Sequence, residues 1–236
     1  MPYQTMSLDE FARLLGMDPR QVQREADHGA LPGRKVGGKW RFNRIQVHDW
    51  IEQHLLAVDA RRLHDLDHSI GKAAQASRTS VTDLIGVEAI ELDLRAATKA
   101  SVLRELVKLA ERTELLYDRQ ELLEALLERE GLGSTALPYG LAIPHPQRPM
   151  PYTTAEPLIC LARVANPIAF NAPDGALTSL FFLICSHESH AHLHTLARLM
   201  RMLNTDTIDR LREVDDSAEA LQLLIEREQA VCDARR

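Results

Sequence analysis

Arg129-Glu-Gly-Leu-Gly-Ser-Thr-Ala-Leu-Pro-Tyr-Gly-Leu-Ala-Ile-Pro-His145-Pro146 is the stretch around which the second half of this chain is organised. A helical pattern ends there, a Gly/Ser/Thr turn follows, and Leu141-Ala-Ile143 is an apolar run typical of a buried strand. The prolines on either side of His145 fix φ and cannot continue a strand ladder. We therefore expect the His145 imidazole at a strand end, where it can be a nucleophile, a metal ligand or a proton shuttle.

Length and composition set the broad class of the protein. The 236 residues, 45% of them hydrophobic, suit one large domain or two smaller ones. No apolar run approaches the roughly 18 residues of a membrane helix, and the first six residues lack the pattern of a secretion signal. Cys160, Cys185 and Cys232 are widely spaced, which favours buried thiols over disulfides or a zinc site. We expect a soluble, cytoplasmic protein without membrane insertion.

The charge is unevenly distributed. The net charge is −6, yet residues 1–55 hold eight Lys or Arg and seven Asp or Glu, which leaves about −7 for the remainder. This asymmetry predicts two domains of different character. The acidic balance argues against nonspecific coating of nucleic acid, although a small module with a local basic face can still bind DNA.

Residues 1–55 carry the signals of a compact helix-turn-helix module. Ser7 can cap a helix over Leu8–Leu15 that Gly16 ends, and Asp18-Pro19 suits the start of a second helix that reaches Asp27. The three-residue break between the two helices is helix-turn-helix spacing.

A hairpin and a third helix are predicted to follow. Gly37-Gly38 separates two short alternating runs, residues 34–36 and 39–42, and such a pair favours a hairpin turn because both positions tolerate φ above zero. Asn43 can then cap a helix over residues 44–54 that packs back on the first two.

The order of four short motifs resembles the excisionase-type members of the winged MerR-like DNA-binding domains over about fifty residues. The motifs are Leu8-Asp-Glu-Phe-Ala-Arg-Leu-Leu-Gly16, Gly29-Ala-Leu-Pro32, Lys35-Val-Gly-Gly38 and Trp40-Arg-Phe42. The resemblance implies that the second helix enters a major groove of double-stranded DNA and that the hairpin lies along the backbone or minor groove. It assigns base or phosphate contacts to Arg20, Gln21, Gln23 and Arg24, and phosphate contacts to Arg34, Lys35, Lys39 and Arg41.

One alternative stays open for this module, and one expectation follows from its size. Each of these eight residues taken singly can belong to an ordinary solvated face. One module of this size also neutralises only a few phosphates, so a homodimer on paired half-sites is expected.

Residues 56–79 read as a connector. Leu56, Leu63 and Ile70 are spaced by seven, but Asp59 interrupts the pattern and only two heptads remain. A plain linker helix is therefore favoured over a dimerising coiled coil. The small, polar run from residue 69 to residue 80 predicts the domain boundary, which gives domains at 1–55 and 80–236.

The second domain reads as an α/β or α+β fold with a mixed sheet flanked by helices. Its order begins strand, helix, helix, strand. We predict strands over residues 90–94, 141–143, 158–164 and 180–185, and helices over 98–110, 118–129, 192–203 and 218–229.

Arg129-Glu130, Ser134-Thr135, the run ending Ala-Ile-Pro-His145, and His192 together resemble the enzyme IIA domain of the fructose/mannitol class of phosphotransferase systems, in its nitrogen-regulatory branch. The resemblance implies that His145 accepts a phosphoryl group from the phosphohistidine of an HPr-like carrier, without a cofactor or metal. It implies that Arg129, Ser134 and Thr135 contact phosphoryl oxygens and that His192 is a second imidazole at the site. The domain is then a phosphocarrier rather than a stand-alone turnover enzyme.

Three departures from the family leave alternatives open. The family usually has glycines where this chain has Ala136, Pro138 and Pro146. One alternative is a binding protein that docks on a kinase or transporter and carries no phosphate, and another is a sugar-specific enzyme IIA. The histidines at positions 187, 190, 192 and 194 also suggest the hypothesis of a metal site. No matching acidic or cysteine ligand is evident in the sequence, so solvated histidines are the favoured interpretation.

Overall fold

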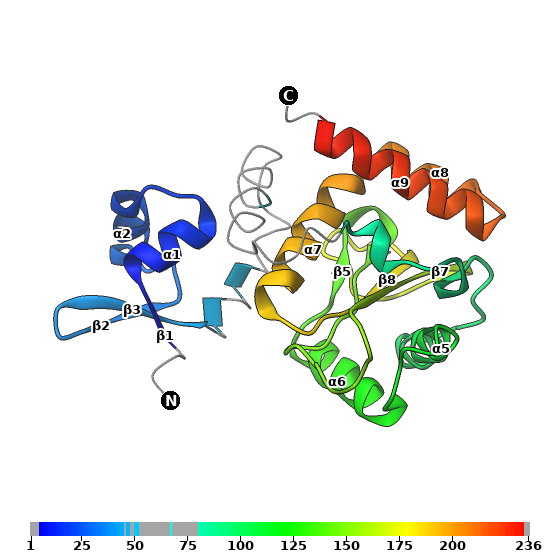
Figure 1. Cartoon of the computed structure of the whole chain (residues 1–236), viewed down its shortest axis with the longest axis horizontal. Coiled ribbons are helices and arrows are strands. Elements are labelled where there is room, and N and C mark those ends of the chain that lie inside the picture. Colours follow the sequence, from blue (N-terminus) through cyan, green and yellow to red (C-terminus); the bar gives the residue numbers. More distant parts are fainter. Residues whose placement is uncertain (1–4, 45, 48–49, 52–66, 68–79, 234–236) are drawn as a thin grey trace. The chain divides into compact units, whose positions relative to one another are not determined.

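The chain folds as two compact units, one formed mainly by residues before 79 and the other mainly by residues from 79 onward (Figure 1). The computed structural model describes residues 5–44, 46–47, 50–51, 67 and 80–233. The two-domain architecture is as the sequence predicted. The predicted connector over residues 56–79 falls, apart from residue 67, outside the described residues.

The first unit consists of two short helices and a three-stranded sheet. A capping box between Ser7 and Glu10 begins α1, and Gly16 ends it with a left-handed φ of 64°. Asp18 accepts a hydrogen bond from the backbone of Arg20 and so begins α2. The third predicted helix is seen as helical residues 44, 46, 47, 50 and 51. The elements are β1 (Thr5–Ser7), α1 (Leu8–Leu15), α2 (Pro19–Asp27), β2 (Gly33–Val36) and β3 (Lys39–Asn43).

The sheet of this unit has one face against α1. Its strands are all antiparallel in the order β1-β3-β2, and β1 is an element that the sequence did not predict. Phe42 is fully buried and stacks on Phe11 of α1, with ring centroids 4.5 Å apart. Since side chains alternate along a strand, Arg41 emerges on the other face, together with its cross-strand partner Arg34.

The second unit contains a mixed five-stranded sheet in the order β4-β7-β8-β6-β5. The pairs β4/β7 and β6/β8 are parallel, whereas β7/β8 and β5/β6 are antiparallel. The predicted strand over 90–94 is shorter, because the chain bends after Glu91. The strands are β4 (Ile90–Glu91), β5 (Ala136–Leu137), β6 (Leu141–Ala142), β7 (Leu158–Ile168) and β8 (Thr178–Cys185).

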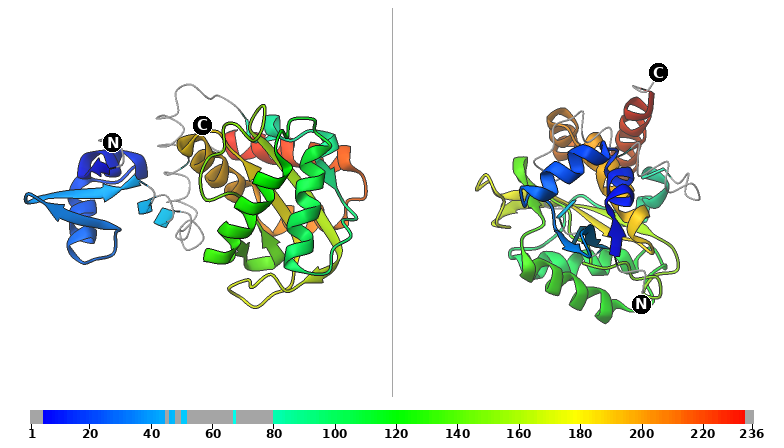
Figure 2. Two further views of the ribbon diagram at one scale, coloured as in Figure 1. Left: turned by 90° about the horizontal axis from the view of Figure 1, so that it is seen from below. Right: turned by 90° about the vertical axis from the view of Figure 1, so that its left-hand side faces the viewer.

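Helices cover both faces of this sheet. Figures 1 and 2 show α5 and α6 on one face and α7, α8 and α9 on the other. Alternate residues of the two long strands, such as Cys160 and Leu183, join the core beneath α5 and α6. The helices are α5 (Lys99–Glu111), α6 (Arg119–Leu132), α7 (Ser189–Met202), α8 (Thr205–Glu213) and α9 (Ser217–Asp233), of which α8 was not predicted.

The beginning of the second unit is fastened to its last helix. Glu228 of α9 is 3% exposed and accepts hydrogen bonds from the backbone N–H groups of Val81 and Thr82, at 2.8 and 2.9 Å, and from the Ser80 hydroxyl. Arg198 of α7 lies 3.4 Å from the same carboxylate. A buried carboxylate with this many donors is fully satisfied, so it fixes the entry of the chain into the unit.

Candidate functional site

His145 follows β6 along the chain and is almost completely buried. The β6 strand pairs in parallel with β8, and the backbone N–H of Ile184 donates to the carbonyl of Pro144 at 3.0 Å, which carries the contact with β8 past the end of the strand. The His145 side chain is 4% exposed. As predicted, the imidazole stands just beyond a strand end.

The hydrogen bonding of His145 fixes which ring nitrogen is reactive. Its Nδ1 lies 2.7 Å from the carbonyl oxygen of Ile143. A carbonyl only accepts, so Nδ1 must carry the proton in this contact, and the lone pair of the neutral ring is then on Nε2. The site therefore holds a histidine with a defined tautomer and a nucleophilic Nε2.

The fold brings His192 next to His145. His192 lies in the first turn of α7, is 4% exposed, and has its ring centroid 4.9 Å from that of His145. Its Nδ1 is 3.3 Å from the Ser186 hydroxyl, at the end of β8. Two imidazoles from distant parts of the sequence thus share one buried position.

Arg129 and Glu130 lie in the last turn of α6 and bond to the loop after it. Arg129 is partly buried, and its guanidinium donates to the carbonyl of Gly133 at 3.0 Å. Glu130 is 8% exposed, pairs with Lys99 at 2.7 Å, and accepts from both the backbone N–H and the hydroxyl of Thr135, at 3.0 and 2.6 Å. The loop conformation therefore depends on a buried carboxylate.

A chain of hydrogen bonds runs from this loop to the histidine. The carbonyl of Thr135 accepts from the backbone of Ile143 at 3.0 Å, and the carbonyl of Ile143 accepts from His145. The Ser134 hydroxyl donates to the Phe170 carbonyl and accepts from the Ala136 backbone at 3.2 Å. Both hydroxyls expected to face a phosphoryl group, those of Ser134 and Thr135, thus donate their protons within the protein.

Sequence reasoning missed two contributors to this arrangement. Glu130 was visible beside Arg129, but nothing in its position indicated a buried role. Lys99 carried no signal, because its contact with Glu130 joins the first turn of α5 to the last turn of α6.

The structure also shows where His187 and two of the cysteines lie. Within the described part of the chain, no three His, Cys, Asp or Glu side chains are arranged to hold a metal ion. His187 instead bonds the Thr154 hydroxyl at 2.9 Å. Burial raises the pKa of the Cys185 thiol to about 12, and Cys160 is also a buried free thiol.

No helix among the described residues is long and apolar enough to span a membrane.

On the first unit, α2 exposes one polar face. Arg20, Gln23 and Arg24 are exposed on it, whereas Gln21 is partly buried and donates to Glu25 at 3.0 Å.

The basic residues of the hairpin do not all share one surface. Lys35 pairs with Asp27 of α2 at 2.7 Å and lies 5.2 Å from the Trp40 ring centroid. Arg34 and Arg41 emerge on the sheet face away from α1, and Arg34 and Lys39 are exposed. The eight predicted DNA contacts are thus distributed over more than one face.

Comparisons with known proteins match each unit separately. The family described as "Phosphoenolpyruvate-dependent sugar phosphotransferase system, EIIA 2" matches residues 83–227, and the family described as "Helix-turn-helix domain" matches residues 5–55.

Individual relatives match the second unit. The nitrogen regulatory protein of Bradyrhizobium diazoefficiens is 37% identical over 145 residues, which cover 60% of this chain and 91% of the relative. The fructose-specific EIIA component of Haloferax volcanii is 30% identical over 151 residues, 63% of this chain and 96% of the relative.

Solved structures agree with these relatives. The nitrogen regulatory protein IIA-Ntr from Neisseria meningitidis superposes with a TM-score of 0.56 at 28% identity, covering 61% of this chain and 98% of that one. IIA mannitol from Escherichia coli superposes with a TM-score of 0.52 at 23% identity, covering 59% and 97%, which shows a shared fold.

Proposed function

Because this chain belongs to the phosphoenolpyruvate-dependent sugar phosphotransferase system EIIA 2 family, we propose that His145 accepts a phosphoryl group from the phosphohistidine of an HPr-like carrier. The observation that carries this proposal is the 2.7 Å contact from Nδ1 to the Ile143 carbonyl, because it places the ring proton on Nδ1 and therefore the lone pair of the neutral imidazole on Nε2. The protein is then a cytoplasmic phosphocarrier.

The transfer needs little covalent chemistry from the protein. A bond forms from His145 Nε2 to phosphorus while the bond from phosphorus to the carrier's imidazole breaks, and the carrier's nitrogen keeps the electron pair. The near-complete burial of His145 limits access of water, which protects a phosphohistidine from hydrolysis. His192 is close enough to interact with the added phosphoryl charge.

Arg129 supplies the positive charge of the proposed site. It stands at the end of α6, and its planar guanidinium can bond two phosphoryl oxygens at once if it leaves the Gly133 carbonyl. Ser134 and Thr135 contribute in this proposal by exchanging their present acceptors for phosphoryl oxygens.

Phosphotransfer is tested with phosphoenolpyruvate, enzyme I and HPr. We expect an acid-labile phosphate on the wild type, no label on His145→Ala, and slower labelling of His192→Gln. His190→Gln, which alters an exposed histidine of the same helix, is the matched control and should label normally. A wild type that never labels, or a His145→Ala variant that labels fully, contradicts the proposal.

We also propose that the first domain binds double-stranded DNA and that phosphorylation of the second domain regulates this activity. The helix-turn-helix match and the exposed face of α2 support the DNA-binding part. Phosphorylation adds about −1.5 to −2 charges. Two copies on paired half-sites are expected, since one module neutralises few phosphates.

DNA binding is tested by measuring affinity across salt concentrations for DNA selected from a random pool. Arg24→Gln and Lys39→Gln should each weaken binding and flatten the salt dependence by about one unit of slope. Arg104→Gln, an exposed change on α5, should have no effect. If all three variants bind as the wild type does, the assigned face is wrong.

A second candidate function is docking without phosphate. It is favoured by the engaged hydroxyls of Ser134 and Thr135 and by Pro146, which has no N–H to offer a phosphoryl oxygen. In that case the domain binds a regulated kinase or transporter, and His145→Ala leaves both partner binding and regulation unchanged.

A further inference from the structure

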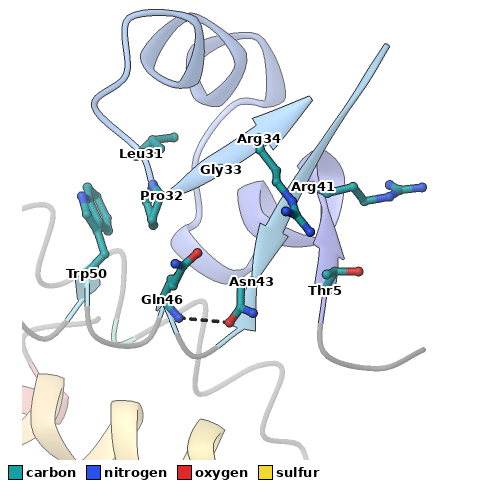
Figure 3. A pocket seen from close by; sticks show the side chains of 9 residues that line it. All are labelled: Thr5, Leu31, Pro32, Gly33, Arg34, Arg41, Asn43, Gln46 and Trp50. Carbon is teal, nitrogen blue, oxygen red and sulfur yellow. Dashed lines mark hydrogen bonds between the residues drawn. The ribbon is translucent and has the colours of Figure 1, made fainter. Parts of the chain in front are cut away.

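A pocket of about 610 Å³ opens in the first unit, beside the sheet face that carries Arg34 and Arg41 (Figure 3). In Figure 3, Arg34 extends over the pocket and Arg41 extends outward at its rim. Among the described residues, no acidic side chain lines the pocket, and neither arginine forms an ion pair with another described residue. The pocket is therefore a site of concentrated, unneutralised positive charge.

One side of the pocket is flat and apolar. Trp50 lines it together with Pro32, and the indole N–H of Trp50 donates to the carbonyl of Ala30 at 3.0 Å. This bond restrains the ring orientation. A restrained indole offers a planar surface on which a nucleobase can stack, and each such stack contributes about 1–3 kcal/mol in nucleic-acid complexes.

Uncharged polar groups complete the lining. The amides of Asn43 and Gln46 and the hydroxyl of Thr5 all contribute to it. The backbone N–H of Gln46 donates to the Asn43 side-chain oxygen at 3.3 Å, which places Asn43 at the start of the third helix. Amide side chains both donate and accept, which matches the mixed edge of a nucleobase.

We propose that this pocket binds one nucleoside phosphate, with its phosphate at Arg34 and Arg41 and its base against Trp50. Guanidinium groups bind phosphate oxygens through two parallel hydrogen bonds. The volume lies within the roughly 300–1,000 Å³ of small-ligand sites. An acidic peptide would also attract the arginines, but its carboxylate side chains have no planar ring that could stack on the Trp50 indole.

The nucleoside phosphate can come from two sources, a free mononucleotide or one nucleotide of a bound DNA strand. The inference goes beyond the proposed function, because phosphotransfer to His145 does not involve the pocket and the exposed residues of α2 do not line it. It shares only the two arginines with the proposed DNA contacts.

The first experiment titrates the full chain with nucleoside 5′-monophosphates, and separately with inorganic phosphate, by calorimetry at low salt. If the natural ligand is a free mononucleotide, a nucleoside 5′-monophosphate binds at one site and more tightly than inorganic phosphate. The double variant Arg34→Gln/Arg41→Gln should bind it at least tenfold more weakly, and Gln46→Ala a few-fold more weakly. Arg104→Gln is the control, and melting curves verify that each variant is folded.

The second experiment measures DNA affinity of the same variants. If no mononucleotide binds, but the double variant and Gln46→Ala both weaken DNA binding, the nucleotide comes from the DNA strand. Two results together overturn the inference. Either no mononucleotide binds or it binds the double arginine variant as tightly as the wild type, and Gln46→Ala binds DNA with wild-type affinity. Arg24→Gln tests the proposed DNA contacts of α2 independently. The proposal of DNA binding by α2 and the proposal of the nucleotide pocket can therefore fail separately.

Discussion

At the residue scale, the candidate site depends on side chains that never need to touch a substrate. Glu130 holds the loop after α6 through Thr135, and the Thr135 carbonyl fixes Ile143, whose own carbonyl orients His145. A carboxylate in this position acts on the imidazole only through backbone groups. Glu130 is therefore a positioning residue.

We predict that Glu130→Gln lowers the free energy of unfolding by about 1–3 kcal/mol, since it removes a charge-assisted bond to Lys99 in a buried site. Labelling of His145 should slow as well, without being abolished. Glu128→Gln makes the same chemical change at an exposed position of α6 and should alter neither property. Denaturant unfolding and phosphotransfer rates measure the two effects, and equal behaviour of the two variants would contradict the role given to Glu130.

The turn before β6 holds two adjacent residues in the left-handed region, Tyr139 at φ 64° and Gly140 at φ 69°. Tyr139 is 62% exposed, so its side chain gains little from burial. A Cβ on Gly140 would lie 2.8 Å from the Leu177 carbonyl oxygen and 2.7 Å from the Arg212 guanidinium. The first position thus tolerates replacement, and the second does not.

Substitutions at these two positions should change the free energy of unfolding in opposite directions. Tyr139→Asn should stabilise the fold by about 1 kcal/mol, because Asn adopts the left-handed conformation more readily. Gly140→Ala should destabilise it by about 1–2 kcal/mol or more, because strain and overlap add. Thermal unfolding of both variants measures this, and the same sign for the two would contradict the backbone argument.

At the element scale, four helices with local caps were predicted, whereas the strands β1 and β5 and the helix α8, which Asn204 caps, were not. Ser7, Asp18, Thr98 and Asp118 cap their helices through their own side chains, which are signals contained within a few residues. The strands β1 and β5 have only three and two residues, and they exist because partner strands from elsewhere supply their hydrogen bonds. Periodicity over so few residues carries no information.

Some features of the candidate site were likewise predictable from local sequence, and others were not. The strand-end placement of His145 followed from local sequence, whereas its neighbour His192 was expected only through resemblance to a family. The contact between Lys99 and Glu130 could not be predicted, because it depends on how α5 and α6 pack.

The ion pair between the hairpin and α2 leads to a prediction about DNA affinity. Asp27 holds Lys35 at 2.7 Å, and this hydrogen bond is the main reason that the pKa of Asp27 is below its usual range. Asp27→Asn should free Lys35 for a phosphate and remove a negative charge beside α2. Binding should tighten, and the salt dependence should steepen by about one unit of slope.

Glu25→Gln is the control for this change, since Glu25 lies on the same helix but bonds Gln21 instead of a cation. Shift assays over a range of salt concentrations provide the measurement. If Asp27→Asn weakens binding, then the hairpin needs this ion pair to keep its shape.

At the scale of the whole molecule, Glu228 makes stability depend on pH. Burial would raise the pKa of this carboxyl, but the hydrogen bonds from Ser80, Val81 and Thr82 outweigh burial and lower it. A lowered folded-state pKa means that the contribution is fully present above the ordinary value of about 4.5 and is lost as pH falls through the folded-state pKa.

Glu228→Gln should therefore melt at a lower temperature than the wild type at pH 7, and this difference should shrink below about pH 4.5. Ser80→Ala removes one donor and should show a smaller loss. Calorimetric melts across this pH range provide the measurement. A difference between Glu228→Gln and the wild type that stays constant down to pH 3 would contradict the assignment.

The contact of Glu228 with residues 80–82 also bears on how such a protein can arise. The chain enters the second unit beside the helix by which it leaves, so both ends of that unit are available at one place. Units of this kind tolerate transplantation and circular permutation, because joining them to another chain disturbs little of the interior. Joining this unit to another chain should therefore leave its interior intact, provided that the segment beginning at Ser80 stays with α9.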